Sequence, residues 1–230
     1  MDYHAIAAAV EAAGFTPRGG FRPGPADGVP GMDDGRPAAA LVLVGNAGPA
    51  MWRRFAAERD PATDRLDDWS REALDRVARD LGGRALYPFT KPPLPFQRWA
   101  ARAEDCKPSP LGIRIHAGYG LWHAYRGALA LAEAAAVPAA VPAAVPRPHP
   151  CDGCADRPCL TACPVAAFDG ERYDVDACVA HIASPAGADC LNGGCLARRA
   201  CPVGRAFTYP PDQQRFHMRA FLKARQREAG

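Results

Sequence analysis

Cysteine is the residue type in this sequence whose spacing most clearly indicates chemistry. The stretch CDGCADRPCLTACP, from Cys151 to Pro164, holds four cysteines separated by two, four and three residues. The 230-residue chain has nine cysteines, and eight of them lie between positions 151 and 201. Thiols crowded in this way in a cytoplasmic chain are typical of metal binding rather than of structural disulfides. The eight candidate ligands are Cys151, Cys154, Cys159, Cys163, Cys178, Cys190, Cys195 and Cys201.

Eight thiolates make two sets of four, and four is the number that a [4Fe–4S] cluster needs. Proline follows both Cys163 and Cys201. In the bacterial ferredoxin pattern, the cysteine before the proline ligates the cluster whose other ligands lie elsewhere in the chain. We therefore predict two [4Fe–4S] clusters whose ligand sets interleave along the sequence. The first set is Cys151, Cys154, Cys159 and Cys201, and the second is Cys163, Cys178, Cys190 and Cys195.

Structural zinc is the alternative reading of the same residues. Four thiolates with C-x₂-C spacing are adequate ligands for zinc. The gap of four residues between Cys154 and Cys159 is wider than in the ferredoxin pattern, so one of the two clusters could be absent or labile. The two Cys-Pro pairs favour iron–sulfur. The ninth thiol, Cys106, lies alone upstream, and neither it nor His181 is assigned a role.

Charge and composition argue against two classes of partner. The formal net charge is +3, and no run of basic residues forms a stripe with interleaved aromatic residues, which gives no support to nucleic-acid binding. The N-terminus has no basic segment followed by a long apolar stretch, so we expect neither a signal peptide nor a membrane anchor, and we place the protein in the cytoplasm.

Hydrophobic periodicity and turn residues predict alternating helices and strands before the cysteines. The segment Leu121–Ala136 fits a helix or a strand equally well. After it, a Val-Pro repeat cannot continue a helix and predicts an extended linker. Expected helices are Tyr3–Ala13, a helix from Pro49, Thr63–Leu81 with Thr63 as N-cap, Pro95–Ala103, and a C-terminal helix from Asp212; expected strands are Ala38–Asn46, Ala85–Phe89 and Leu111–His116; a loop is expected over Arg18–Pro37.

Two upstream segments resemble a known family. LVLVGNAGPAMWRRF is similar to a strand–loop–helix of the cobalamin-processing CblC family, and IHAGYGLWHAYRGALAL resembles its His-Pro-x-aromatic-Gly-Gly-Trp-x-x-x-Arg-Gly segment. The family's His-Pro is His116-Ala117 here, and its Gly-Gly is Gly120-Leu121. The resemblance implies a cobalamin site, since a corrin needs an apolar floor, close backbone approach and a few polar donors. The implied contacts are His116, Gly118, Tyr119, Gly120, Trp122 and Arg126.

The relationship extends to epoxyqueuosine reductases and reductive dehalogenases, in which the two clusters divide as predicted above. It implies an α+β chain, with a nitroreductase-like cobalamin-binding domain followed by a small bacterial-ferredoxin-like two-cluster domain. We expect the first over residues 1–133, a linker over 134–149, the second over 150–210 and a C-terminal helix over 211–230.

The function implied by the resemblance is a cobalamin-binding reductase or cobalamin-processing protein. Its partners would be cobalamin or a small substrate and a protein that donates electrons, and its cofactors would be two [4Fe–4S] clusters and cobalamin. One alternative is a ferredoxin-type electron carrier whose upstream domain docks a partner without cobalamin. Another is an interaction protein stabilised by zinc.

Overall fold

The fold comes from a computed structural model that describes residues 2–60, 65–104, 106–133 and 148–228. The chain forms two compact units. Unit 1 contains the described residues of Met1–Asp105 and His123–Arg147, and unit 2 contains those of Cys106–Trp122 and Pro148–Gly230. The segment Cys106–Trp122 therefore groups with the cysteine-rich part and not with the residues around it in sequence.

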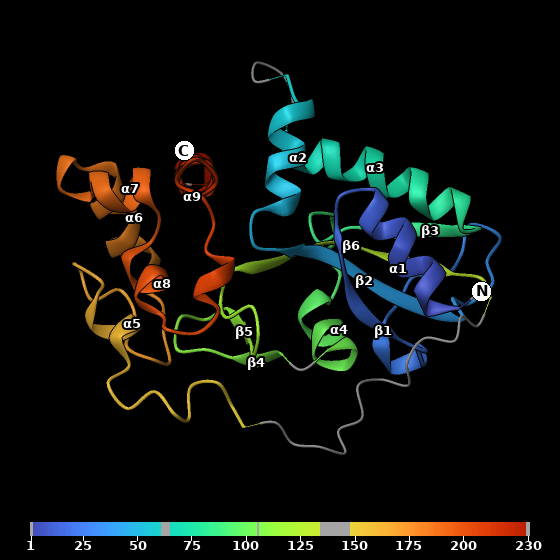
Figure 1. Ribbon diagram of the computed structural model, residues 1–230, viewed down its shortest axis with the longest axis horizontal. Helices are drawn as coiled ribbons and strands as arrows, with labels where there is room; N and C mark the ends of the chain where they lie inside the picture. The colour runs from blue at the N-terminus through green and yellow to red at the C-terminus, as the bar shows by residue number, and fades with distance from the viewer. Residues whose placement is uncertain (1, 61–64, 105, 134–147, 229–230) are drawn as a thin grey trace. The chain divides into compact units, whose positions relative to one another are not determined.

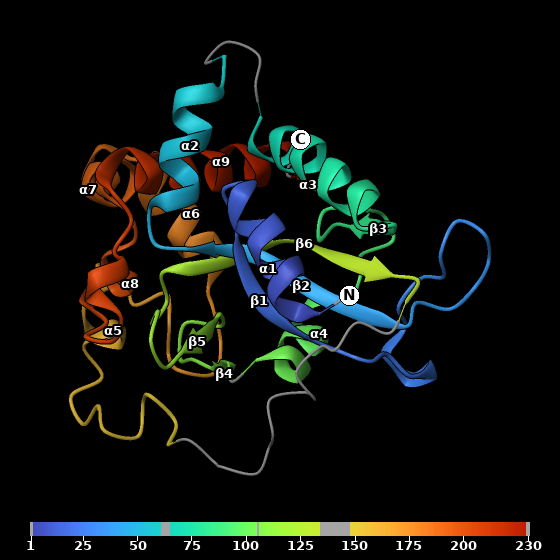
Figure 2. The same cartoon turned by 45° about the vertical axis from the view of Figure 1, so that its right-hand side comes forward.

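Unit 1 is built on a four-stranded antiparallel sheet in the order β1-β2-β6-β3 (Figure 2). The central strand β2 is the apolar run ALVLVGNA, and its first seven residues are buried. A short strand with two covered faces needs apolar side chains on both, which explains a continuous apolar run where alternation would otherwise be expected. The strands are β1 (Thr16–Phe21), β2 (Ala40–Ala47), β3 (Gly83–Leu86) and β6 (His123–Leu131).

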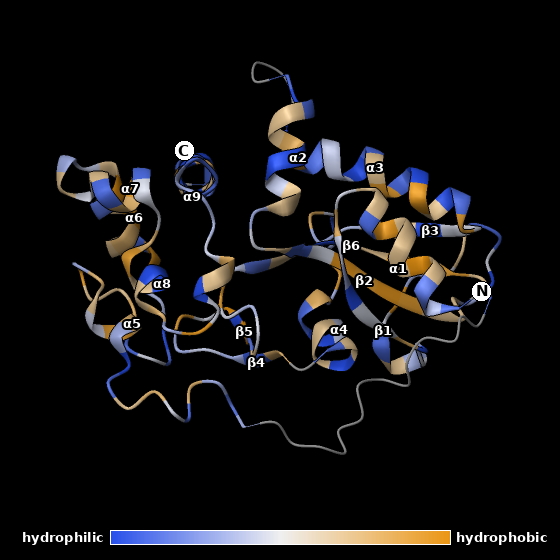
Figure 3. Ribbon diagram, in the orientation of Figure 1, coloured by the Kyte–Doolittle hydropathy of each residue, from blue (hydrophilic) through white to orange (hydrophobic). Residues whose placement is uncertain are grey.

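Helices cover both faces of this sheet. The helices α1 and α3 lie on one face and α4 lies on the other (Figure 1), and β2 is the most apolar strand between them (Figure 3). On the α4 side, Trp99 packs with Leu41 and Leu43 in one buried cluster. On the α3 side, Gly127 is needed because a Cβ there would lie 2.7 Å from the Leu74 side chain. The helices are α1 (Tyr3–Ala12), α2 (Ala50–Glu58), α3 (Leu66–Asp80) and α4 (Phe96–Ala103), with a 3-10 turn η1 at Pro25–Asp27.

Unit 2 combines a small hairpin with short helices. Leu111, Ile115 and Leu121 from the hairpin region are buried against Ala167 and Ala197 from the cysteine-rich part. This shared core explains why the hairpin belongs to unit 2. The elements are β4 (Cys106–Pro108), β5 (Arg114–His116), α5 (Pro158–Thr161), α6 (Val175–Ala183), η2 (Pro185–Gly187), α7 (Ala188–Gly193), α8 (Leu196–Ala200), η3 (Arg205–Phe207) and α9 (Pro211–Glu228).

The mixed α+β class is confirmed, with four corrections of detail. The predicted strand Ala85–Phe89 begins and ends too late in the sequence, since β3 spans Gly83–Leu86. The predicted loop from Arg18 is wrong at its start, because Arg18–Phe21 completes β1, which pairs with β2. The predicted strand at Leu111–His116 is shorter, since only Arg114–His116 pairs with β4. The ambiguous segment forms the strand β6, because pairing with β2 and β3 on both sides outweighs its local helix propensity. Thr63 and most of the predicted linker lie outside the described residues. Among the described helices, none is long and apolar enough to cross a membrane.

Candidate iron–sulfur site

The pKa shifts of the thiols in unit 2 indicate two groups of neighbouring cysteines. Five thiols have a raised pKa. The other thiols that contribute most to each shift belong to the same predicted set. In the first set, these electrostatic effects on the pKa link all four cysteines. Within the second, Cys178 is affected by Cys163 and Cys190, and Cys195 by Cys178 and Cys190. The grouping agrees with the interleaved division that the sequence predicts.

The environment of these thiols resists ionisation. Burial raises the pKa of Cys151, Cys159, Cys178, Cys195 and Cys201, and neighbouring thiolates of the same set raise it further. None of the described cysteines forms a disulfide. Partly buried thiols with a raised pKa are stabilised as thiolates by a bound cation, which a metal centre supplies. The donor set therefore fits a metal centre in each group.

The four thiols of the first set line one small apolar cavity. Ile115 of the hairpin and Val203 lie in its wall. Cys201 ends α8, and a hydrogen bond from the backbone of Val203 lowers the pKa of its thiol against the effect of burial. Backbone N–H groups that face thiolates are a common feature of iron–sulfur sites and help to set their potential. The four thiols are those of Cys151, Cys154, Cys159 and Cys201.

The second set is placed by three helices and a turn. Cys178 lies in α6, Cys190 in α7, and Cys195 directly before α8. Cys163 follows α5, and its Sγ accepts a hydrogen bond of 3.3 Å from the backbone N–H of Ala167. The Tyr173 hydroxyl donates to Cys178, which lowers the pKa of that thiol although burial raises it overall. Tyr173 is thus a polar partner of the second set that sequence spacing did not indicate.

The spacing of the sulfurs bears on the choice between zinc and iron–sulfur. With Zn–S bonds of about 2.3 Å, a tetrahedral site brings its four sulfurs to within about 4 Å of one another. In the described part of the chain, none of the eight sulfurs belongs to a group of three potential ligand atoms that lie mutually within 4.8 Å. A cubane is wider, because iron and sulfide atoms lie between its thiolates. The sulfurs are therefore spaced more widely than in a four-thiolate zinc site.

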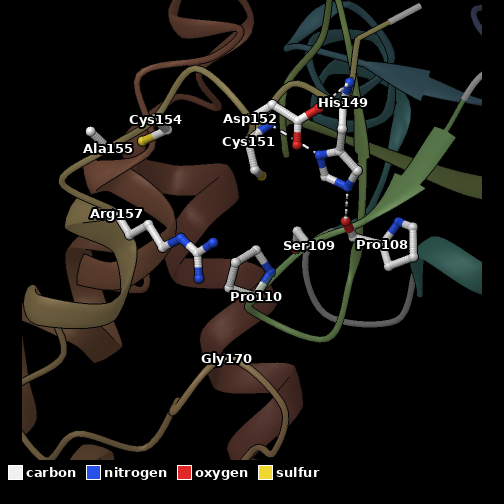
Figure 4. A pocket seen from close by; sticks show the side chains of 10 residues that line it. All are labelled: Pro108, Ser109, Pro110, His149, Cys151, Asp152, Cys154, Ala155, Arg157 and Gly170. Atoms are coloured by element: carbon white, nitrogen blue, oxygen red, sulfur yellow. Dashed lines mark hydrogen bonds between the residues drawn. The ribbon is translucent and has the colours of Figure 1, made fainter. Parts of the chain in front are cut away.

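An open cavity of about 530 Å³ adjoins Cys151 and Cys154 (Figure 4). His149 ties its two walls together: Nδ1 accepts from the Cys151 N–H at 3.0 Å, and Nε2 lies 2.8 Å from the carbonyl oxygen of Pro108. A carbonyl oxygen can only accept, so Nε2 is the donor in this contact. His149 therefore holds the first cysteine turn to the β4–β5 hairpin. Arg157, in the same wall, has a left-handed backbone at φ 39°, a strained conformation for a side chain of this size.

Five of the six residues expected to contact cobalamin lie together in unit 2, around the turn that follows β5. The turn is closed by His116, whose Nδ1 accepts from the N–H groups of Gly118 and Tyr119 at 3.0 and 3.1 Å. Its ring stacks on Tyr119 with centroids 4.3 Å apart. Gly120, at φ +58°, packs so closely on Val203 that a Cβ would lie 2.0 Å from the Val203 carbonyl oxygen. These four residues have a packing role, and their contact with a corrin stays a prediction.

Trp122 is buried beneath a cation. The Arg198 guanidinium lies 4.7 Å from the centroids of both the Trp122 and Tyr209 rings, and its Nη2 donates to the Leu121 carbonyl oxygen at 2.5 Å. Trp122 is 1% exposed, and its indole N–H has no hydrogen-bond partner among the residues that the structure describes. A buried N–H without a partner costs about 1–3 kcal/mol, which makes this atom a candidate donor to a bound group. Arg198 follows Cys195 by three residues, a position that the spacing analysis did not single out.

Arg126, the sixth expected contact, belongs to unit 1. Its guanidinium donates to Asp67 at 2.5 Å and to the Ser70 hydroxyl at 3.2 Å, both on α3. The Arg126 side chain is 12% exposed, and its charge is already paired with Asp67 inside unit 1. The structure does not group Arg126 with the five residues of the turn.

A buried polar network in unit 1 was not expected from the sequence. The fully buried Arg18 guanidinium forms hydrogen bonds of 3.0 and 2.5 Å with the two carboxylate oxygens of Glu104. The Tyr125 hydroxyl donates to the same carboxylate, and Arg18 lies 3.1 Å from Nδ1 of His123. Removal of one partner of such a pair leaves a buried charge without compensation, which typically costs about 3–5 kcal/mol. The network therefore fixes the start of β1 and the start of β6 to the end of α4.

Comparison with known proteins gives one structural match of note. A solved structure of epoxyqueuosine reductase from Bacillus subtilis, with its catalytic loop swung out of the active site, is similar to this chain at 16% sequence identity and a TM-score of 0.48. The match covers 92% of this chain and 69% of that chain. No family model matches, and no curated protein matches. The chain's own helices and strands make it a mixed α+β protein.

Proposed function

We propose that this protein is an iron–sulfur reductase that holds two [4Fe–4S] clusters and delivers their electrons to cobalamin. The observation that carries the proposal is that the four thiols of the first set line one small apolar cavity, while α6, α7 and the start of α8 carry three thiols of the second set. When bound, each cluster supplies storage for one electron at a time. The name of the similar structure, a reductase, agrees with this chemistry.

The residues of this chain would act as ligands, hydrogen-bond donors and shields. Cys201 closes the first group from a distance in sequence, so that α5 and α8 are held together by the cluster they share. The N–H of Ala167 and the hydroxyl of Tyr173 donate to sulfurs of the second group and stabilise negative charge there. Ile115 and Val203 exclude water from the first group.

The fit to cobalamin is partial. In the described part of the chain, the buried indole N–H of Trp122 is a donor without a partner, as a ligand site would need. Two other expected contacts are engaged within the chain: Gly120 lies against the carbonyl of Val203, and Arg126 is paired with Asp67. Cobalamin as the acceptor therefore rests on the resemblance of the His116–Gly127 segment.

The alternative, a ferredoxin-type electron carrier without cobalamin, has an observation in its favour. The residues from His116 to Gly120 are explained by packing within unit 2 alone, because they close a turn and seat it on the chain after Cys201. On this reading unit 1 would bind a partner protein, and the chain would show two clusters and no response to a corrin.

The cluster part is tested by anaerobic reconstitution with iron and sulfide, followed by metal analysis and EPR after reduction. We expect about eight iron atoms per chain, and about four in each of the variants Cys154→Ala and Cys190→Ala, which remove ligands from different sets. A double variant that loses two of the four ligands of the first set, Cys151→Ala with Cys154→Ala, should still keep the signal of the second cluster. Stoichiometric zinc in place of iron would overturn the proposal.

The cobalamin part is tested separately by titration of the reconstituted protein with cob(II)alamin. Saturable perturbation of the cobalt EPR signal, weakened in Trp122→Phe with iron content unchanged, would support cobalamin as the acceptor. Arg53→Gln, an exposed change in unit 1, is the control. Two clusters with no perturbation of cobalt would establish the electron-carrier alternative.

A further inference from the structure

The C-terminal helix α9 carries a row of cations along one face. Arg215, Arg219, Lys223 and Arg227 repeat every four residues, and all four are exposed. Residues four apart lie on the same side of a helix, about 6 Å from one another along its axis. We call these four residues the cationic row. It has the periodicity of one helix face rather than that of a continuous basic run, so composition alone does not reveal it.

The cationic row is not neutralised within the described part of the chain. None of its four members takes part in an ion pair there, whereas the neighbouring Arg225 is paired with Glu228 at 2.7 Å. Like charges four residues apart destabilise an isolated helix by about 0.2–0.5 kcal/mol per pair, and the row contains three such pairs. A helix that keeps this arrangement without an internal anion fits an external partner that is negative.

The opposite face of α9 packs on the second set of cysteines. Gln213 and Gln214 are buried there, and α9 contacts α6 and α7, the helices that carry Cys178 and Cys190. The Phe221 ring lies 6.4 Å from the ring of Tyr173, whose hydroxyl donates to Cys178. One helix thus separates the cationic row from the second set of thiols.

We propose that the cationic row is the docking surface for an acidic one-electron carrier protein that reduces the second cluster. This inference rests on the proposed function for the cluster itself. In the transfer the reduced carrier loses one electron and the oxidised cluster gains it, and no bond or proton need change. Charge complementarity steers such encounters and raises association rates by about 10- to 1,000-fold at low salt. A protein donor is favoured over nucleic acid because the surface lies over a redox centre and carries no exposed aromatic residues for stacking.

The test uses the reconstituted full chain and reduced flavodoxin, an acidic flavoprotein, as the probe. The variant changes Arg215, Lys223 and Arg227 to Glu. We expect the second-order rate of cluster reduction in stopped flow to fall at least about tenfold at low salt, and the difference from the unchanged protein to vanish near 0.5 M salt, where charges are screened within a few ångströms. Reduction by photogenerated deazaflavin, a small neutral donor, should be unaffected.

A matched control reverses three exposed arginines of unit 1, Arg53, Arg76 and Arg79, which makes the same change in net charge. Equal slowing in both variants would show an effect of net charge and overturn the proposal. So would an unchanged flavodoxin rate, or a loss of binding to single-stranded RNA without a change in that rate. If the chain takes up no cluster at all, calorimetric titration with oxidised flavodoxin still tests the surface, which separates failure of the docking proposal from failure of the proposed function.

Discussion

Replacement of Tyr173 by Phe gives the sharpest test of how this structure would tune a redox centre. The change removes one hydroxyl that donates to Cys178 and leaves the ring, which stacks on Phe168 with centroids 4.5 Å apart and 13° between planes. A hydrogen bond to a charged group contributes about 1.5–3 kcal/mol. The bond is stronger in the reduced cluster, which carries one more negative charge. If about a third of that energy differs between the two oxidation states, the difference is about 0.5–1 kcal/mol.

For a one-electron couple, about 1.4 kcal/mol corresponds to 59 mV, so the potential of the second cluster should fall by about 20–40 mV in Tyr173→Phe. The assay is an EPR-monitored redox titration in the Cys154→Ala background, in which the first cluster is removed. Tyr87→Phe is the control, because it removes a buried hydroxyl in unit 1 that is bonded to Asp75 at 2.6 Å. A potential that stays within error of the parent, or that shifts as far in Tyr87→Phe, would refute the reasoning.

Three further outcomes follow from single contacts. Gly120→Ala should destabilise unit 2 by about 2–4 kcal/mol in denaturant unfolding, because the residue has a left-handed backbone and a Cβ would overlap the Val203 carbonyl. Asp27 is buried, which raises its pKa, but hydrogen bonds from Arg102 and from the backbone outweigh burial and lower it overall. Its stabilising effect is therefore present above about pH 4 and is lost as pH falls through the lowered pKa, so unfolding of Asp27→Asn between about pH 3 and 5 should depend less on pH than that of the parent. Cys106→Ser should leave iron content unchanged, since the thiol lies outside both sets; a fall in iron by half would show that it is a ligand.

The parts of the fold that the sequence predicted are those with a strong local pattern. The helix from Tyr3 is capped by Asp2 at its start, and Gly14 follows it with φ +88°, as a C-terminal glycine should. The strand from Ala40 is a continuous apolar run. The segment from His123 to Leu131 was ambiguous because alanine and leucine favour a helix locally. Its pairing with β2 and β3 decides the matter, and no short window of sequence contains that information.

The candidate site likewise contains residues that the sequence predicted and residues that it did not. The proline after Cys201 predicted that this cysteine joins the first three, and all four line one cavity, while their role as ligands stays a prediction. The cysteine spacing could not predict the roles of Tyr173, His149 and Arg198. Each of them contacts its partner through a turn or across the end of a helix. Their roles depend on where the chain folds back, which the intervals between cysteines do not encode.

The placement of the hairpin changes where this chain can be divided. A boundary after residue 133 looks natural in the sequence, because the proline-rich segment follows it. A fragment ending there would retain Leu111, Ile115 and Leu121, each no more than 5% exposed, but would lose Ala167 and Ala197, against which they pack. Burial of a Leu or Ile side chain contributes about 1.5–3 kcal/mol, so the fragment would expose apolar surface worth several kcal/mol. We therefore expect residues 1–133 to aggregate when expressed alone, and to become more soluble when Leu111, Ile115 and Leu121 are changed to Ser. A fragment that stays monomeric by sedimentation and binds no hydrophobic dye would show that the hairpin does not need the cysteine-rich part.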